Sequence, residues 1–117
     1  MSVVVVEASE SLSHVAVSGQ LTQLGVERLT AEFLAHTAKR GVDTIVDLSD
    51  VSFLASAGLG LLANCRKQLQ RSGARMVLLN PQPQAAQAIK ASRMDILLPI
   101  LHSVDQARAA LAEPDSA

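Results

Sequence analysis

The 117-residue sequence predicts an α/β fold with a small mixed, mostly parallel sheet of four to five strands and about four helices. Short runs of β-branched and aliphatic residues alternate with longer segments whose apolar residues recur at helical spacing, and such alternation leads to right-handed crossovers and parallel strands. Hydrophobic residues make up 49% of the chain and charged residues 18%, a composition typical of a globular core. We expect a single domain over residues 1–117, with a frayed tail at 113–117.

The chain opens with a predicted β-hairpin followed by a helix. Residues 3–6 are all valine and 14–18 alternate weakly between apolar and polar, so both are expected to be strands joined by the polar segment 7–13. Apolar residues then recur at helical spacing over 24–40. Gly41 has the place of the glycine that ends a helix.

The next predicted strand leads into the second helix. Residues 44–46 are rich in β-branched side chains, and the polar segment 47–50 is expected to turn the chain. A second apolar patch, 51–54, then delivers the chain to Ser56. A helix begins there and ends near residues 72–73, which places Ser56 at or next to its N-cap.

The last third of the chain holds the remaining predicted elements. Residues 75–79 are almost continuously apolar, as in a strand inside a sheet, and 84–92 form a short helix. Pro99 restricts any fifth strand beside it to a short one at the sheet edge. Ser103 and Gln106 have the spacing of a capping box, which opens a last helix.

Composition argues against several classes of function. The formal net charge is −1, the basic residues are scattered, and the aromatic content is 2%, so direct binding to nucleic acid is not expected. The single cysteine, Cys65, excludes an internal disulfide and lies on an apolar helix face, where a buried, inert thiol is expected. The sequence shows no signal peptide and no apolar stretch of about 18 residues. We therefore expect a cytoplasmic protein without membrane insertion, cofactor or metal.

Ser56 is the residue whose surroundings are unusual. A serine at this place commonly caps the helix by accepting a hydrogen bond from a first-turn N–H. Here Ala55, Ala57 and Gly58 leave its hydroxyl uncovered, and a phosphate added there would meet the N–H groups and the dipole of the helix start. A cap and a modification site are both consistent with these residues.

Two enzymatic interpretations of the same stretch are weaker. Residues 58–63 match G-x-G-x-x-G/A, but about ten residues separate them from the preceding strand, and Asn80 stands where a ribose-binding acid is expected. Close helix packing is the better use of the two glycines. Leu54 replaces the first glycine of a nucleophile elbow, and no pattern brings a histidine to Ser56. The three histidines are expected at the surface or at strand ends.

The stretch 46–62, VDLSDVSFLASAGLGLL, resembles the signature of the STAS domain, the fold of bacterial anti-sigma factor antagonists, and the order of the other elements fits as well. The resemblance implies a non-enzymatic binding module in which Ser56 is the phosphorylation switch. It also implies that the polar residues before the switch shape an acidic lip that a partner reads. The implied partner-binding residues are Asp47, Ser49, Asp50, Ala55, Ser56, Ala57, Gly58 and Leu59.

In the resembled family, the unmodified protein binds an anti-sigma factor that is itself a serine kinase, phosphorylation by ATP ends the binding, and a serine phosphatase restores it. Two residues depart from the family pattern, Ala55 in place of an acid and Thr22 in place of an aspartate. Ala55 and Ala57 also fit an alternative, a constitutive structural STAS subunit of a phospholipid-transport ABC complex without phosphoregulation. Whether the output is a sigma factor, and whether the chain is a monomer or a weak dimer, stays open.

Overall fold

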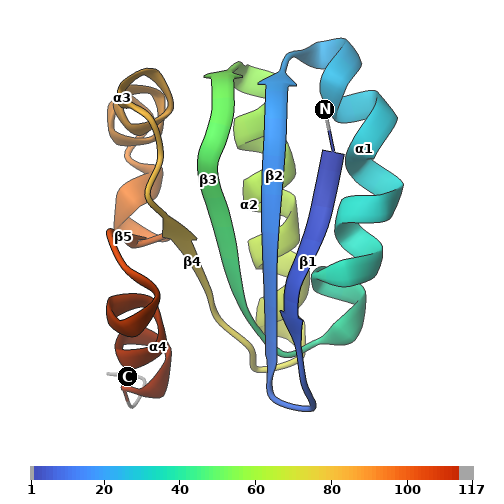
Figure 1. The fold of residues 1–117 in the computed structure, drawn as a ribbon, viewed down its shortest axis with the longest axis vertical. Helices are drawn as coiled ribbons and strands as arrows, with labels where there is room; N and C mark the ends of the chain where they lie inside the picture. The colour runs from blue at the N-terminus through green and yellow to red at the C-terminus, as the bar shows by residue number, and fades with distance from the viewer. Residues whose placement is uncertain (1, 114–117) are drawn as a thin grey trace.

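The computed structural model describes residues 2–113 (Figure 1). Its strands are β1 (Ser2–Ala8), β2 (Leu12–Leu21), β3 (Asp43–Leu54), β4 (Met76–Leu79) and β5 (Ile100–Leu101). Its helices are α1 (Gln23–His36), α2 (Ser56–Arg71), α3 (Pro83–Ala91) and α4 (Val104–Ala112), with 3₁₀ turns η1 (Ala38–Arg40) and η2 (Met94–Ile96). The strands form one sheet in the order β1-β2-β3-β4-β5, in which β1 and β2 are antiparallel and the other pairs parallel. The predicted fold class and the short fifth strand at the sheet edge are confirmed.

Helices cover the two faces of the sheet unequally. On one face α1, α2 and α3 pack on the main core, which includes Phe33, Leu62 and Ile89. On the other face α4 packs on a second, smaller core that contains Ile45 and Leu111. Figure 1 shows α1 and α2 behind the sheet and no helix in front of β1 and β2. We call this uncovered side of β1, β2 and β3 the open face.

The first helix starts as expected but ends earlier than predicted. The side chain of Thr22 accepts a 3.2 Å hydrogen bond from a first-turn N–H, so threonine serves here as the N-cap. The helix stops at His36 because Thr37 leaves the helical conformation, and the Thr37 hydroxyl donates to the Phe33 carbonyl at 2.7 Å. The turn η1 then leads to Gly41, whose φ of 65° is the left-handed value expected of a helix-ending glycine.

The prediction of a polar turn at 47–50 is wrong, because this segment continues β3. Two steps along β2, from Ala16 to Ser18, correspond to three steps along β3, so β3 carries a β-bulge there. Within the bulge the Ser49 N–H donates to Asp47 Oδ1 at 2.9 Å. This local contact occurs both in turns and in bulged strands, so it does not distinguish the two. The pairing of β3 with β2, which is distant in sequence, makes the segment a bulged strand.

Cys65 is buried in the main core, as predicted. Its Sγ lies 3.3 Å from Thr37 Oγ1, which links α2 to the residue that follows α1. Burial raises the pKa of the Cys65 thiol, and the hydrogen bonds with Thr37 and with the Ala38 backbone only oppose this shift. A protonated thiol without solvent access is a packing group, not a nucleophile.

His14 is buried, contrary to the expectation that the histidines lie at the surface or at strand ends. It lies within β2, is 5% exposed, and its Nε2 has no hydrogen-bond partner within residues 2–113. It stands opposite Glu7 of β1, which forms a 2.5 Å ion pair with Arg108 of α4. Burial lowers the pKa of His14 from its ordinary value of 6.5, Asp47 and Glu7 oppose this shift, and Arg108 adds to it.

We expect the free energy of unfolding to fall as the pH is lowered through about 6.5. Above this pH His14 is neutral in both states, whereas below it the unfolded chain binds a proton that the folded protein accepts only at lower pH. The free energy of unfolding can be measured by urea denaturation at several pH values between about 7 and 5. It should fall less steeply with decreasing pH in His14→Gln than in the parent protein. The control is His102→Gln, because that side chain is exposed. An equal fall of the free energy of unfolding with pH in His14→Gln and in the parent would contradict this prediction.

Candidate functional site

Ser56 is the first residue of α2, and its side chain is exposed. The N-cap is Ala55, whose backbone is extended, so Ser56 lies next to the N-cap, one of its two predicted places, and is not the capping residue itself. The helix opens with the N–H groups of Gly58 and Leu59 donating to the Ala55 carbonyl at 2.9 and 3.1 Å. The hydroxyl of Ser56 therefore stands at the positive end of a 16-residue helix and is accessible to solvent.

The start of α2 packs directly on the ends of β2 and β3, and Gly58 makes this possible. A Cβ at Gly58 would lie 2.5 Å from Leu54 Cδ1 and 3.0 Å from Leu21 Cβ, so no larger residue fits without movement. A Cβ at Gly60 would meet nothing within 4 Å. The expectation that both glycines serve close packing is therefore correct for Gly58 and wrong for Gly60.

Two hydrogen-bonding contacts hold the chain in front of Ser56. The Ala55 N–H donates to the Leu21 carbonyl at 3.0 Å, which ties the loop to the end of β2. On the other side Gln84 acts as a clamp, since its Oε1 accepts from the Leu54 N–H at 2.8 Å and its Nε2 donates to the Leu54 carbonyl at 3.0 Å. These contacts fix the residue from which the chain leaves the sheet toward Ser56.

The Gln84 clamp replaces a missing strand. Pairing between β3 and β4 ends at Asp47 and Leu79, so the second half of β3 has no strand on that side. Gln84, at the start of α3, and Gln82, whose Nε2 donates to the Ser49 carbonyl at 2.8 Å, bond to this half instead. Sequence reasoning missed both glutamines. No signal in the sequence pointed to them, because the third strand was predicted only over residues 44–46, and the mismatch between its 12 residues and the 4 residues of β4 is visible only in the structure.

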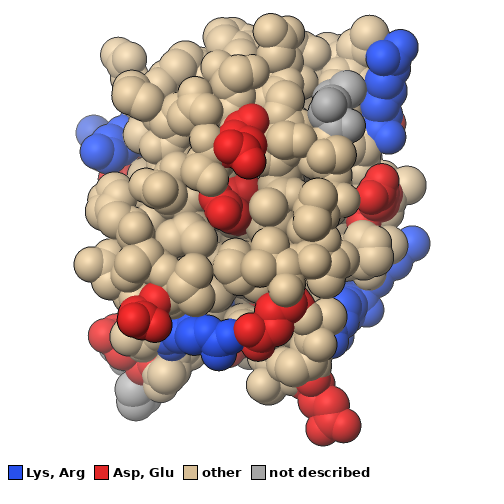
Figure 2. Space-filling view, viewed as in Figure 1, with Lys and Arg blue, Asp and Glu red and all other residues tan. Residues whose placement is uncertain are grey.

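The predicted acidic residues do not adjoin Ser56. Asp47 pairs with Ala16 and Asp50 with Ser18, which places both acids on the open face, opposite the face that α2 covers. Asp50 also precedes the end of β3 by four residues, a rise of about 13 Å. Figure 2 shows acidic side chains close together near the middle of this face, surrounded by uncharged surface. Asp47 and Asp50 thus form an acidic patch of the open face and not a lip around Ser56.

The surface around Ser56 is apolar. The first turn of α2 contains no acidic residue, and Leu59 is half-buried beside it. Leu24, in the first turn of α1, is 54% exposed. Phe53 is 42% exposed, but it directly precedes Leu54, whose side chain is in the main core, so Phe53 points to the open face. Because Leu21 pairs with Leu54, the start of α1 and the start of α2 lie at the same end of the sheet (Figure 1).

We call this region the Ser56 surface and define it by Leu24, Ala55, Ser56, Ala57 and Leu59. Sequence reasoning did not identify Leu24, which the sheet brings to this end of the molecule from a segment 32 residues before Ser56. In residues 2–113 no group of three or more His, Cys, Asp and Glu side chains is arranged to hold a metal ion. No helix of that part of the chain combines the length and the apolar character needed to cross a bilayer.

Comparison with known proteins places this geometry in a family. The model of the STAS domain matches residues 3–107. The chain is 35% identical over 66 residues to the anti-sigma F factor antagonist of Lysinibacillus sphaericus, a match that spans just over half of each chain, 56%. The structure is similar to that of an anti-sigma factor antagonist from Mycobacterium paratuberculosis, with a TM-score of 0.80 and 25% identity over 96% of both chains. It also shares the fold of the Bacillus cell fate determinant SpoIIAA in its phosphorylated form, with a TM-score of 0.68 and 20% identity over 93% of this chain and 98% of that one. This chain belongs to the STAS domain family, and the proteins similar to it include anti-sigma factor antagonists.

Proposed function

We propose that this protein is a non-enzymatic anti-sigma factor antagonist that acts by partner switching. In the proposed cycle the unmodified Ser56 surface binds an anti-sigma factor that is also a serine kinase, phosphorylation of Ser56 by ATP ends the binding, and a serine phosphatase restores it. The observation that carries the proposal is an exposed hydroxyl at the start of α2, inside an apolar surface. The names of the similar proteins, and a fold neighbour that exists in a phosphorylated form, support it.

Phosphorylation would change this surface strongly because the surface starts without charge. A phosphoserine carries about −1.5 to −2 charges at neutral pH, and no acid stands in the first turn of α2. In the free protein the N–H groups of the helix start can stabilise the phosphate. In a complex, Ala55 and Ala57 would let the partner approach closely, and burying the phosphate there would cost several kcal/mol. A difference of about 3 kcal/mol lowers affinity more than a hundredfold.

The acidic patch of the open face gives the same partner a second contact. Asp47 and Asp50 present negative charge at a distance from the Ser56 surface, so they favour a partner with basic residues facing the open face. Charges of this kind raise the rate of association and select the partner more than they raise affinity. The proposed contacts are therefore divided between an apolar surface that contains the switch and an acidic patch that orients the partner.

The cytoplasmic location stays a prediction.

The test combines modification with partner capture. The purified protein is incubated with ATP and candidate serine kinases, and its intact mass is measured. We expect one added phosphate, which is absent in Ser56→Ala. In a quantitative binding assay with the captured anti-sigma factor, Ser56→Asp should reduce affinity at least about tenfold, because one negative charge is placed in the apolar contact.

The matched control is Ser72→Asp, which adds the same charge at an exposed position at the other end of α2. It should leave partner affinity unchanged. Absence of any phosphate on Ser56, together with a stable complex that is indifferent to Ser56→Asp, would contradict partner switching. That result would favour a constitutive structural STAS subunit of a lipid-transport complex.

A further inference from the structure

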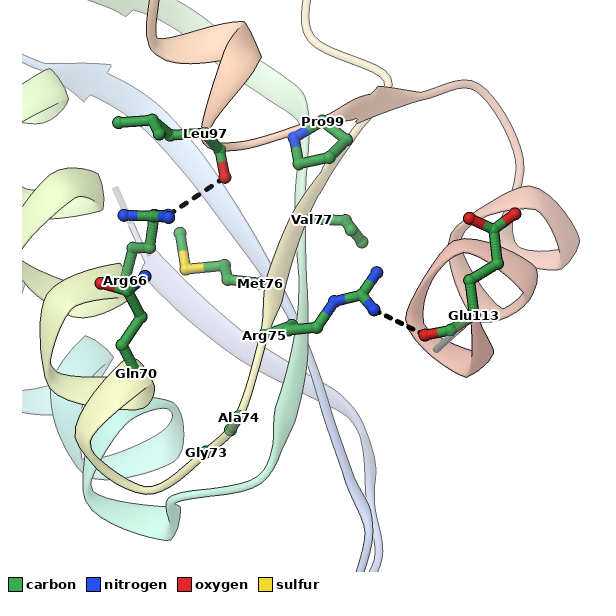
Figure 3. Close-up of a pocket in the computed structure, with 10 residues that line it drawn as sticks. All are labelled: Arg66, Gln70, Gly73, Ala74, Arg75, Met76, Val77, Leu97, Pro99 and Glu113. Atoms are coloured by element: carbon green, nitrogen blue, oxygen red, sulfur yellow. Dashed lines mark hydrogen bonds between the residues drawn. The ribbon is translucent and has the colours of Figure 1, made fainter. Parts of the chain in front are cut away.

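A cleft of about 360 Å³ lies at the opposite end of α2 from Ser56 (Figure 3). Arg66 and Gln70 of α2 form one wall, and Arg75 and Glu113 stand across from them. Its volume lies in the lower part of the range of small-molecule sites. Arg66 follows Ser56 by ten residues, a rise of about 15 Å along the helix. The cleft is therefore separate from the Ser56 surface.

The two arginines of the cleft are held in place by neutral acceptors. Arg66 Nε donates to the Leu97 carbonyl at 3.1 Å. Arg75 Nη1 donates to the Glu113 carbonyl at 2.7 Å, and its Nη2 donates to the Ala110 carbonyl at 2.5 Å. Within residues 2–113 neither guanidinium has a carboxylate within 4.0 Å. Both side chains are half-buried, so in the part of the chain that the structure describes two positive charges face the cleft without an ionised partner.

The hydrogen bonds of the arginines determine which of them can bind a ligand. Arg75 uses both terminal nitrogens to hold the end of α4, so it contributes positive potential from its wall. Among the described residues Arg66 forms a side-chain hydrogen bond through Nε alone, so neither of its terminal nitrogens is used there. Two parallel N–H groups of this kind match a phosphate or a carboxylate in a bidentate contact. Because the Arg66 guanidinium is already held by the Leu97 carbonyl, it loses little conformational entropy when such a contact forms.

The remaining lining favours a ligand with a carbon body. Pro99 is exposed and presents its apolar ring to the cleft (Figure 3). Glu113 contributes one negative charge to the rim, which leaves the cleft with a formal charge of +1 from the two arginines and this glutamate. We propose that the cleft binds a small organic anion, with its phosphate or carboxylate group on Arg66 and its apolar part against Pro99.

The test is a titration followed by NMR on the full chain at constant ionic strength. Phenyl phosphate and benzoate are the probes, phenol is the neutral control, and inorganic phosphate reports the anion alone. We expect saturable shifts of the backbone amides of residues 73–77, with a Kd of about 1 mM or below for the better aromatic anion and weaker binding of inorganic phosphate. Tighter binding of phenyl phosphate identifies a phosphate ester as the ligand, and tighter binding of benzoate identifies a carboxylic acid.

The variant Arg66→Gln should weaken binding at least tenfold. Arg71→Gln is the matched control, because it removes the same charge from an exposed position at the end of the same helix. The spectrum of each free variant shows whether it is folded. Equal weakening in both variants, binding of phenol as tight as that of the anions, or shifts that do not saturate would overturn the proposal. None of these results depends on whether Ser56 is phosphorylated.

Discussion

Replacing Gly58 with alanine is expected to lower the free energy of unfolding by about 2 kcal/mol. The new Cβ would lie 2.5 Å from Leu54 Cδ1, and Leu54 cannot turn away because it is 1% exposed in the core. The second contact, 3.0 Å to Leu21 Cβ, is with a group fixed to a strand. Alanine forms helices more readily than glycine by about 1 kcal/mol, and the expected loss is what remains after this gain.

The matched control for this prediction is Gly60→Ala, two residues further along α2. A Cβ at Gly60 meets nothing within 4 Å, so the gain in helix propensity of about 0.5–1 kcal/mol should appear undiminished. Urea denaturation of the two variants should therefore give shifts of opposite sign. A Gly58→Ala variant as stable as Gly60→Ala would show that α2 does not pack against β2 and β3 as described. Because Leu54 lies two residues before Ser56, the same displacement is expected to move the Ser56 surface.

The sequence predicted those features of the fold that depend on neighbouring residues. The apolar run 44–46, the helix that begins at Ser56 and the capping residue Ser103, whose side chain accepts from the Gln106 N–H at 3.1 Å, were all read correctly from local patterns. Local chemistry was ambiguous at Asp47 and Ser49, because an Asx contact serves a turn and a bulge equally. The pairing of β3 with β2 decided the outcome, and no local pattern contains it.

Burial caused the second group of differences. His14 occupies a weakly alternating segment, and what buries it is the second core beneath α4, which lies about 90 residues later in the chain. The α1 helix ended early because Thr37 bonds both to its own helix and to Cys65 of α2. The predicted tail at 113–117 lies, apart from Glu113, outside the described residues. Glu113 itself is bonded through its carbonyl to Arg75.

The candidate site was predicted in part for the same reason. Ser56 and Gly58 could be identified because the signature is continuous in sequence. Its apolar surroundings at Leu24 and its support by Gln84 come from segments about 30 residues before and after it, and they are brought together only by the sheet. Asp47 lies in the signature, yet the pleat directs it to the other face. Residues that are close together in the signature are therefore not all close together in the structure.

The second large effect is expected for Gln84→Ala, which should lower the free energy of unfolding by about 1–3 kcal/mol, because two hydrogen bonds are lost at a partly buried site. The Leu54 N–H and carbonyl, at 2.8 and 3.0 Å from the Gln84 amide, would both lose their partner beside a buried side chain. No strand can replace it, because β4 ends at Leu79. Gln87→Ala is the matched control, since Gln87 is exposed on the same helix.

Amide hydrogen exchange distinguishes loss of this clamp from a general loss of stability. The Leu54 N–H should exchange much faster in Gln84→Ala than in Gln87→Ala, whereas amides in the middle of β3, such as that of Val46, should change only as far as global stability falls. Gln84→Glu should give an intermediate result, because the carboxylate keeps the acceptor for the Leu54 N–H but has no donor for its carbonyl. Equal exchange of Leu54 in all three variants would contradict the clamp. Fast exchange confined to Leu54 and the residues up to Ser56 would show that two hydrogen bonds from α3 hold the end of β3, and hence the Ser56 surface, in place.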